Sequence, residues 1–257
     1  MDRLKDKVAV ICGGGSGLGE ATSMLFAREG AHVAICDINE KNGNEVTDAV
    51  IDKGGIARFF KIDVTDESFV QQVFEEIENE FGQINILVNC AGLVGTTRLP
   101  DEIEYEEWEK ILNLDLNGTF ITSRNVIKYL RKQGGGSIVN ISSIAGLVSE
   151  CAGVTPYHVA KAGVAMMTKS FAVSYAKENI RCNCVCPAAT LTKMTKAYAI
   201  QNYGSVKGYE DDSAGIIPMG RLGDPLETAY GILYLASDEA SWTTGVALPI
   251  DGGLTSW

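Results

Sequence analysis

The chain has 257 residues, of which 46% are hydrophobic and 21% charged, and its formal net charge at pH 7 is −11. This composition is typical of a globular α/β protein with a large core, and no apolar run reaches the ~18 residues that a membrane-spanning helix needs. The acidity and the lack of a basic patch argue against a nucleic-acid partner, and the sequence starts without a secretory leader, so no membrane partner and a cytoplasmic location are expected.

Short runs of apolar and β-branched residues alternate with longer amphipathic segments along the chain. They predict, in order, a strand at 7–15, a helix at 19–30, a strand at 32–38, a helix at 40–54, a strand at 56–65, a helix at 67–82, a strand at 84–92, a long helical region at 105–134, a strand at 136–146, a helix at 155–179, a strand at 180–188, a helix at 225–237 and a strand at 245–253. Apolar strands separated by helices indicate a parallel sheet covered on both faces. The sequence therefore predicts one domain over residues 1–257, an α/β Rossmann-type doubly wound fold with a seven-stranded parallel sheet, whose ligands bind beyond the carboxyl ends of the strands.

The chain contains seven cysteines, three of which alternate in the predicted strand RCNCVCP as Cys182, Cys184 and Cys186. Alternate residues of a strand lie ~6.6 Å apart on one face. Three thiols in such a row cannot easily surround one tetrahedral ion, so packing rather than a metal site is predicted. The odd number of cysteines also favours a reducing compartment.

A glycine-rich loop, GGGSGLG, follows the first predicted strand and places Gly13, Gly17 and Gly19 at the start of a helix. Such a loop lets the backbone approach a diphosphate, whose charge is stabilised at the helix N-terminus. Asp37 ends the second predicted strand, where a carboxylate can accept hydrogen bonds from the adenine-ribose diol and repel a 2′-phosphate. No Lys or Arg follows it before Lys41, so the sequence favours NAD over NADP; the alternative is that Asp37 only caps the following turn.

The sequence YHVAK puts Tyr157 and Lys161 four residues apart, on one face of a predicted helix. A phenol with a pKa near ~10 is a poor base at neutral pH, and a nearby ammonium lowers that pKa by stabilising the phenolate. Tyr157 can then take a proton from an alcohol while hydride leaves for a nicotinamide. The preceding strand ends in ISS, which offers the hydroxyls of Ser142 and Ser143 to a substrate oxygen.

Taken together, these motifs resemble the short-chain dehydrogenase/reductase family over almost the whole chain, from Lys7 to about Thr255. The resemblance rests on GGGSGLG, DV at Asp63, NCAG at Asn89, ISS, YHVAK, CPAATLT and IDGG, which occur in that order. It implies a catalytic set of Ser143, Tyr157 and Lys161, with Asn89 also steadying the central sheet. It implies that the cofactor contacts Gly13, Ser16, Gly17, Leu18, Gly19, Asp37, Ile38, Asp63, Val64, Asn89, Ala91, Gly92, Tyr157, Lys161, Pro187, Thr190 and Thr192.

The chain departs from the family pattern at two places that concern the site. Ser143 precedes Tyr157 by one residue more than is usual, which leaves Ser142 open as the alternative. In ILNLDLNGTF, Asp115 stands where the family has the Asn that forms the fourth member of the catalytic set. Asp115 is then either a tolerated near-isostere, or a carboxylate that strengthens the positive charge on Lys161 or disturbs the helix kink that the Asn stabilises.

The segment after CPAATLT, about residues 193–222, is expected to form a substrate lid. Its aromatic and aliphatic residues suit a bulky apolar alcohol such as a hydroxysteroid or a cyclic alcohol. Ordinary packing within the lid explains these residues equally well. Val148, Cys151 and Val154 are expected in the pocket wall, and His158 outside it. The leading hypothesis is thus an NAD-dependent secondary-alcohol dehydrogenase without a metal. The alternatives are an NADPH-dependent 3-ketoacyl reductase and a non-catalytic dinucleotide sensor. The resemblance further implies a homotetramer or homodimer, formed through the apolar surfaces of residues 107–120 and 164–176.

Overall fold

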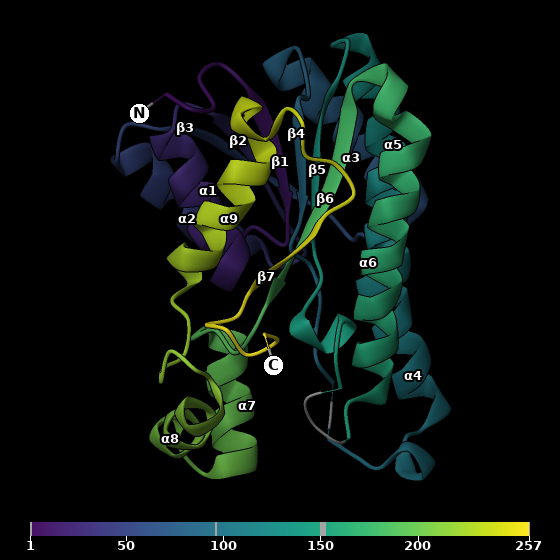
Figure 1. Cartoon of the computed structure of the whole chain (residues 1–257). Helices are drawn as coiled ribbons and strands as arrows, with labels where there is room; N and C mark the ends of the chain where they lie inside the picture. Colours follow the sequence, from purple (N-terminus) through teal and green to yellow (C-terminus); the bar gives the residue numbers. More distant parts are fainter. Residues whose placement is uncertain (1, 96, 150–152, 257) are drawn as a thin grey trace.

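A single parallel sheet organises the computed structural model, which describes residues 2–95, 97–149 and 153–256 (Figure 1). Its strands lie in the order β3-β2-β1-β4-β5-β6-β7, and all of them pair in parallel. They are β1 (Val8–Cys12), β2 (His32–Asp37), β3 (Ile56–Lys61), β4 (Ile86–Asn89), β5 (Gly136–Ile141), β6 (Ile180–Pro187) and β7 (Ala247–Ile250). The predicted seven-stranded parallel sheet and α/β class are confirmed.

Helices cover both faces of the sheet (Figure 1). They are α1 (Gly17–Arg28), α2 (Glu40–Asp52), α3 (Glu67–Phe81), α4 (Tyr105–Leu112), α5 (Thr119–Lys132), α6 (Thr155–Tyr175), α7 (Lys193–Tyr203), α8 (Val206–Ile216) and α9 (Pro225–Ala236), with short helical segments η1 (Pro100–Glu102), η2 (Asn113–Gly118), η3 (Ile144–Gly146), η4 (Ala176–Glu178) and η5 (Asp238–Ala240). On one side, α1, α2 and α9 pack together, and on the other lie α3, α5 and α6 (Figure 1).

The alternation of side chains along β1 shows why both faces are covered. Val8, Val10 and Cys12 belong to the core cluster shared with α3 and α5, whereas Ala9 and Ile11 belong to the cluster shared with α1 and α9. Every residue of this strand is buried, as expected for a strand with an apolar layer on each side.

The strand order reverses between β1 and β4, so the connections leave these neighbours toward opposite faces of the sheet. Such a switch point opens a crevice at the carboxyl ends of the strands. The glycine loop follows β1 and the NCAG segment follows β4, so the two motifs lie on either side of this crevice.

Two regions differ from the sequence-based expectation. The long helical region at 105–134 is interrupted by η2, a π-helical turn at Asn113–Gly118 that separates α4 from α5. The segment at 193–222, expected as a lid and assigned no helix or strand from the sequence, contains the helices α7 and α8, which stand beyond the carboxyl ends of the strands (Figure 1). We keep the name lid for residues 193–222.

The cysteines of RCNCVCP lie on β6 as predicted, and Cys182, Cys184 and Cys186 are all buried. Burial raises the pKa of the Cys182 thiol to about 12, which keeps it protonated. Within residues 2–95, 97–149 and 153–256, no three His, Cys, Asp or Glu side chains gather as metal ligands would. In the same ranges, no helix combines the length and apolar character required to cross a membrane.

Candidate active site

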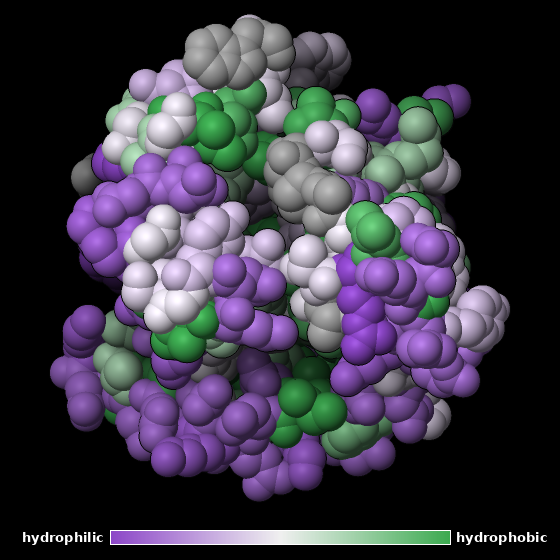
Figure 2. All heavy atoms as spheres, turned by 90° about the horizontal axis from the view of Figure 1, so that it is seen from below, coloured by the Kyte–Doolittle hydropathy of each residue, from purple (hydrophilic) through white to green (hydrophobic). Residues whose placement is uncertain are grey.

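A cleft of about 580 Å³ lies at the carboxyl ends of the strands. Seen from that end, the surface is hollowed between the two sides of the molecule, with polar and apolar patches around the opening (Figure 2). The cleft is lined by the four predicted catalytic positions and by all the predicted cofactor positions except Asn89. The fold therefore brings together motifs that are spread from residue 13 to residue 192 of the chain.

The glycine loop forms the floor of one end of the cleft. Gly13 has φ of 78° and Gly17 has φ of 57°, backbone conformations that favour glycine. A Cβ at Gly13 would lie 2.6 Å from the amide nitrogen of Ala91, and one at Gly17 would lie 3.4 Å from the side chain of Thr192. The loop thus leads into the N-terminus of α1 with its backbone bare on the cleft side, an arrangement that fits the diphosphate of a dinucleotide.

Asp37 lies at the end of β2 and lines the same end of the cleft. Its Oδ2 accepts a hydrogen bond from the amide of Gly15 at 2.9 Å, and its Oδ1 accepts one from the amide of Asn39 at 2.9 Å. The carboxylate is therefore fixed by the glycine loop and the following turn together. Asp37 therefore does cap the following turn, as the alternative interpretation holds. Because Asp37 also faces the cleft, its remaining lone pairs can accept hydrogen bonds from a ligand.

Asn89 is the predicted cofactor residue that the cleft does not reach. Its Nδ2 donates to Oδ1 of Asn140 on β5 at 2.9 Å and to Oγ of Ser123 at 3.1 Å, while its Oδ1 accepts from Oγ1 of Thr122 at 2.8 Å. All its side-chain groups are engaged inside the protein, and its contact with a cofactor ribose stays a prediction. Its position supports the other expected role, which is to fix the ends of β4 and β5 relative to α5.

Tyr157 and Lys161 both face the cleft from the first turns of α6. The Nζ of Lys161 lies 5.4 Å from the centre of the Tyr157 ring, and it donates to the carbonyl oxygen of Ile141 at 3.1 Å. Lys161 is only 4% exposed. The ammonium is therefore held between the end of β5 and the phenol, where its charge favours the phenolate.

The two candidate serines have different environments. Oγ of Ser142 donates to the carbonyl oxygen of Lys161 at 2.8 Å, so this hydroxyl is used to hold α6 against β5. Oγ of Ser143 accepts from the amide of Ala145 at 3.1 Å, and its contact with the carbonyl oxygen of Pro187 is long, at 3.5 Å. The hydroxyl proton of Ser143 is the freer of the two, so the geometry favours Ser143 over Ser142 as the group for a substrate oxygen.

Asp115 lies in the π-helical turn η2 and is fully buried. Its Oδ1 accepts from the amide of Leu93 at 2.9 Å, and its Oδ2 forms an ion pair with Nζ of Lys161 at 3.0 Å. Burial lowers the pKa of the Lys161 ammonium, but the Asp115 carboxylate and Tyr157 raise it by more, so this pKa lies above its ordinary value. The carboxylate in ILNLDLNGTF is thus paired inside the site.

The lid forms the opposite wall of the cleft. Tyr198 and Tyr203 of α7 and Tyr209 of α8 pack edge-on or tilted against one another, with ring centres 5.1 to 6.4 Å apart. The rings are joined by Met194, Ile216 and Ile217 in the lining. The wall is therefore mainly aromatic and aliphatic, as the sequence predicts.

Four further expectations concern Val148, Cys151, Val154 and His158. Val154 lines the cleft as predicted, but Val148 does not, because it follows η3 with its side chain turned partly to solvent. Cys151 lies outside the described residues. His158 does not line the cleft, and burial lowers the pKa of its imidazole.

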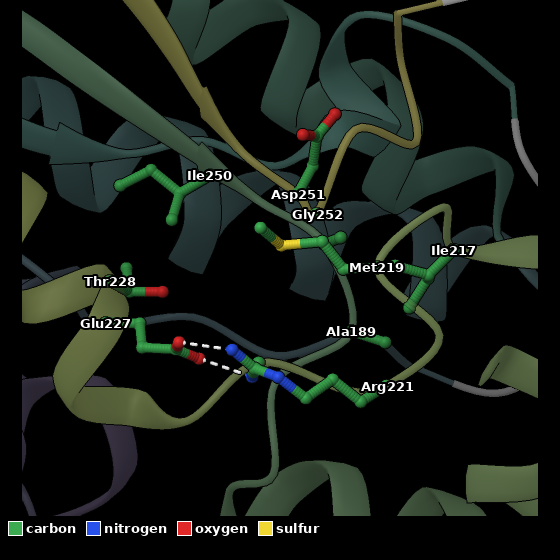
Figure 3. A pocket seen from close by; sticks show the side chains of 11 residues that line it. Ala189, Ile217, Met219, Arg221, Glu227, Thr228, Ile250, Asp251 and Gly252 are labelled. Atoms are coloured by element: carbon green, nitrogen blue, oxygen red, sulfur yellow. Dashed lines mark hydrogen bonds and ion pairs between the residues drawn. The ribbon is translucent and has the colours of Figure 1, made fainter.

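A small cavity of about 100 Å³ adjoins the cleft behind the lid (Figure 3). Arg221 at the end of the lid forms two hydrogen bonds with Glu227 of α9, at 2.6 and 2.8 Å, and the Met219 side chain projects between them and Asp251 (Figure 3). The residues that flank the lid also meet, since the amide of Leu191 donates to the carbonyl oxygen of Gly223 at 3.0 Å. This end of the lid is therefore tied to the body of the protein.

Several lining residues escape the sequence-based prediction. Ile62, Leu93 and Ile144 are direct chain neighbours of predicted residues or motifs, so their proximity to the motifs could have identified them. Leu254 enters the cleft because the chain turns back after IDGG, where Asp251 accepts hydrogen bonds from the Gly253 and Thr255 amides. The sequence Asp-Gly-Gly marks the turn, but it does not indicate that the turn brings Leu254 to the cleft.

Comparison with known proteins agrees with this geometry. Residues 13–255 match the family described as Enoyl-(Acyl carrier protein) reductase. The chain is 38% identical over 252 residues to the 3-oxoacyl-[acyl-carrier-protein] reductase FabG of Thermotoga maritima, covering 98% of this chain and 99% of the relative. It is 36% identical over 251 residues to the cis-4-hydroxycyclohexanecarboxylate dehydrogenase of Sinomonas cyclohexanicum, covering 98% of this chain and 97% of the relative.

A solved structure of levodione reductase superposes with a TM-score of 0.94 at 31% sequence identity, covering 98% of each chain. Membership of one protein family therefore explains the fold, the order of the motifs and their convergence on one cleft. The chain belongs to the short-chain dehydrogenase/reductase family, whose members are oxidoreductases that use a nicotinamide dinucleotide.

Proposed function

We propose that the protein interconverts a secondary alcohol and a ketone with NAD(H), and that its substrate carries the reacting carbon in or beside an apolar ring. The observation on which this rests is the convergence of Ser143, Tyr157 and Lys161 on one cleft that also contains the glycine loop. A proton donor or acceptor, a hydroxyl for the substrate oxygen and a dinucleotide cradle are the parts that such a reaction requires.

The side chains divide the chemistry among them. When bound, the nicotinamide supplies or accepts the hydride. In the oxidation direction, Tyr157 takes the hydroxyl proton of the alcohol, and Ser143 donates a hydrogen bond to the same oxygen. Lys161, held 5.4 Å from the phenol ring, favours the phenolate that this step needs. In reduction the same groups work in reverse, with Tyr157 returning its proton to the new alkoxide.

The preference for NAD over NADP is supported by the charge at the Asp37 end of the cleft. A 2′-phosphate placed there would meet the Asp37 carboxylate at short range. The cationic residues in the lining are Lys161, which is paired with Asp115, and Lys193 at the start of α7. Lys61, which is the register partner of Asp37, is paired with Glu40 and does not line the cleft. The same reasoning disfavours the alternative of an NADPH-dependent 3-ketoacyl reductase. One of the relatives carries the name of a 3-oxoacyl reductase.

The ring-shaped substrate is supported by the lid wall. Tyr198, Tyr203 and Tyr209 present flat aromatic surface, and such surface packs well against alicyclic and steroid rings. The named substrate of one relative is a hydroxylated cyclohexane, which has this shape.

The test is a panel of monocyclic alcohols, 3-hydroxysteroids and straight-chain secondary alcohols, each with NAD and with NADP, followed by the absorbance of the reduced nicotinamide. We expect kcat/KM with NAD to be at least about tenfold higher for the cyclic substrates than for the straight-chain alcohols. A difference of this size is what one additional well-packed methylene group typically produces. Faster turnover with NADP would refute the cofactor assignment. Absence of turnover across the panel, with dinucleotide binding retained, would favour the sensor alternative.

The outer surface of α5 and α6 supports the proposal of a homotetramer or homodimer. Met166 is 65% exposed and Val173 84% exposed, and Phe120 and Val159 are also exposed on these helices. Apolar side chains in such a row are usually covered in the working protein. We expect light scattering to give a mass of at least two chains, and Val173→Asp to reduce it. A monomer at micromolar concentration would contradict this assignment.

A further inference from the structure

The buried pair of Asp115 and Lys161 is an unusual feature for a site that needs a positive charge. Asp115 is 0% exposed and Lys161 is 4% exposed, so both charges are removed from water. Either charge alone would cost several kcal/mol at such a position, and pairing offsets that cost. The two side chains therefore stabilise each other's charged form.

The surroundings show that the carboxylate is held in place rather than merely accommodated. Oδ1 of Asp115 accepts a hydrogen bond from the amide of Leu93. The main-chain carbonyl oxygen of Asp115 accepts one from Oγ1 of Thr119 at 2.8 Å. A Cβ at Gly92 would lie 2.8 Å from Oδ2 of Asp115 and 3.2 Å from Nζ of Lys161. The segment after β4 thus holds the carboxylate of Asp115, and the first residue of α5 holds its main chain.

Three titratable groups face the ammonium from the elements packed around it. They are Asp115 from η2, Tyr157 from α6 and Cys90 from the end of β4. Burial raises the pKa of the Cys90 thiol, which therefore stays neutral at physiological pH. The negative charge of Asp115 consequently offsets the positive charge of Lys161 in the electrostatic field at Tyr157.

We propose that Asp115 is a positioning residue that fixes the Lys161 ammonium through a buried ion pair and, by balancing its charge, sets the pH at which Tyr157 becomes a base. This inference rests on the proposed function. A bare ammonium favours the phenolate strongly, whereas an ammonium paired at 3.0 Å with a carboxylate acts on its surroundings more as a dipole and favours the phenolate less. The chain is therefore adapted to oxidise alcohols at a higher pH than it would with an amide at this position.

The decisive variant is Asp115→Asn, because the amide keeps the size of the side chain and an acceptor for the Leu93 amide while removing the charge. We expect the acid limb of the kcat/KM profile for alcohol oxidation to move to lower pH by about one unit, the lower end of the effect of one close charge. The matched control is Asp212→Asn, which removes the same charge from the exposed lid side of the same cleft. An acid limb that does not move in Asp115→Asn, or that moves equally in Asp212→Asn, would overturn the inference.

A second measurement needs neither substrate nor cofactor. We expect Lys161→Met to lower the thermal midpoint by at least about 6 °C, because Asp115 is left buried without its partner, and the double variant Asp115→Asn/Lys161→Met to recover part of that loss. Since the pKa of Lys161 is raised above 10.5, the stabilisation is complete below that pH and is lost as the pH rises through the folded pKa. Additive midpoints would contradict the ion pair. Non-additive midpoints in a protein that oxidises no alcohol would leave the ion pair intact and refute the proposed function instead.

Discussion

Replacing Tyr157 by Phe is expected to lower kcat for alcohol oxidation by about 10²- to 10⁴-fold, the usual contribution of a positioned acid or base. The change removes only the hydroxyl that we propose exchanges a proton with the substrate oxygen, and it leaves the ring beside Lys161. Dinucleotide affinity, measured by titration of NADH fluorescence, is expected to change much less than kcat. Such a split between chemistry and binding identifies a group that acts in the transition state.

The matched control for this variant is Tyr129→Phe. Tyr129 is buried in the core on α5, and its hydroxyl has no hydrogen-bond partner among the described residues. Loss of that hydroxyl is expected to leave turnover unchanged and the thermal midpoint equal or higher, since an unsatisfied buried group is removed. Full turnover by Tyr157→Phe would refute the proposed mechanism.

The second large effect is expected for Gly19→Ala. An added Cβ would overlap the carbonyl oxygen of Gly13 and lie 2.8 Å from its carbonyl carbon. Both obstructing atoms are backbone, so α1 and the glycine loop would have to move apart. Strain of this kind typically costs about 1–3 kcal/mol, and we expect a fall of roughly 10- to 100-fold in NADH affinity, measured by calorimetry.

Gly215→Ala provides the comparison, because nothing lies within 4 Å of a Cβ added at that position of α8. There the added methyl group is expected to leave NADH affinity unchanged and to raise the thermal midpoint slightly, as Ala favours a helix over Gly. If the two substitutions changed NADH affinity equally, the close packing of the glycine loop would not be the cause.

The parts of the fold that the sequence predicts are those with strong local patterns. The seven strands are short apolar runs bounded by glycine or polar residues, and the structure places all of them in one sheet. The glycine loop, Asp37 and YHVAK likewise reach one cleft, because parallel strands bring their carboxyl ends to the same edge. Chain order and sheet geometry together thus determine most of the candidate site.

The remaining features depend on contacts between distant segments. The apolar pattern of residues 105–134 suits one helix, and the π-helical turn at Asp115 becomes apparent only with the structure, where that residue contacts Leu93 and Lys161. The choice between Ser142 and Ser143 likewise depends on a bond to the carbonyl oxygen of Lys161. In both cases the deciding partner lies far along the chain, where sequence patterns give no distance.

The joined ends of the lid have a consequence for how substrate preference can change. Thr190 and Gly223 form an isolated parallel bridge, so the lid leaves the body of the protein and returns to it at nearly one point. A loop closed at its base can change in length or composition at little entropic cost. Ser143 after β5 and Tyr157 on α6 both lie outside this loop. We therefore expect replacement of the lid by that of a relative to change which alcohols are accepted more than it changes the thermal midpoint of the protein.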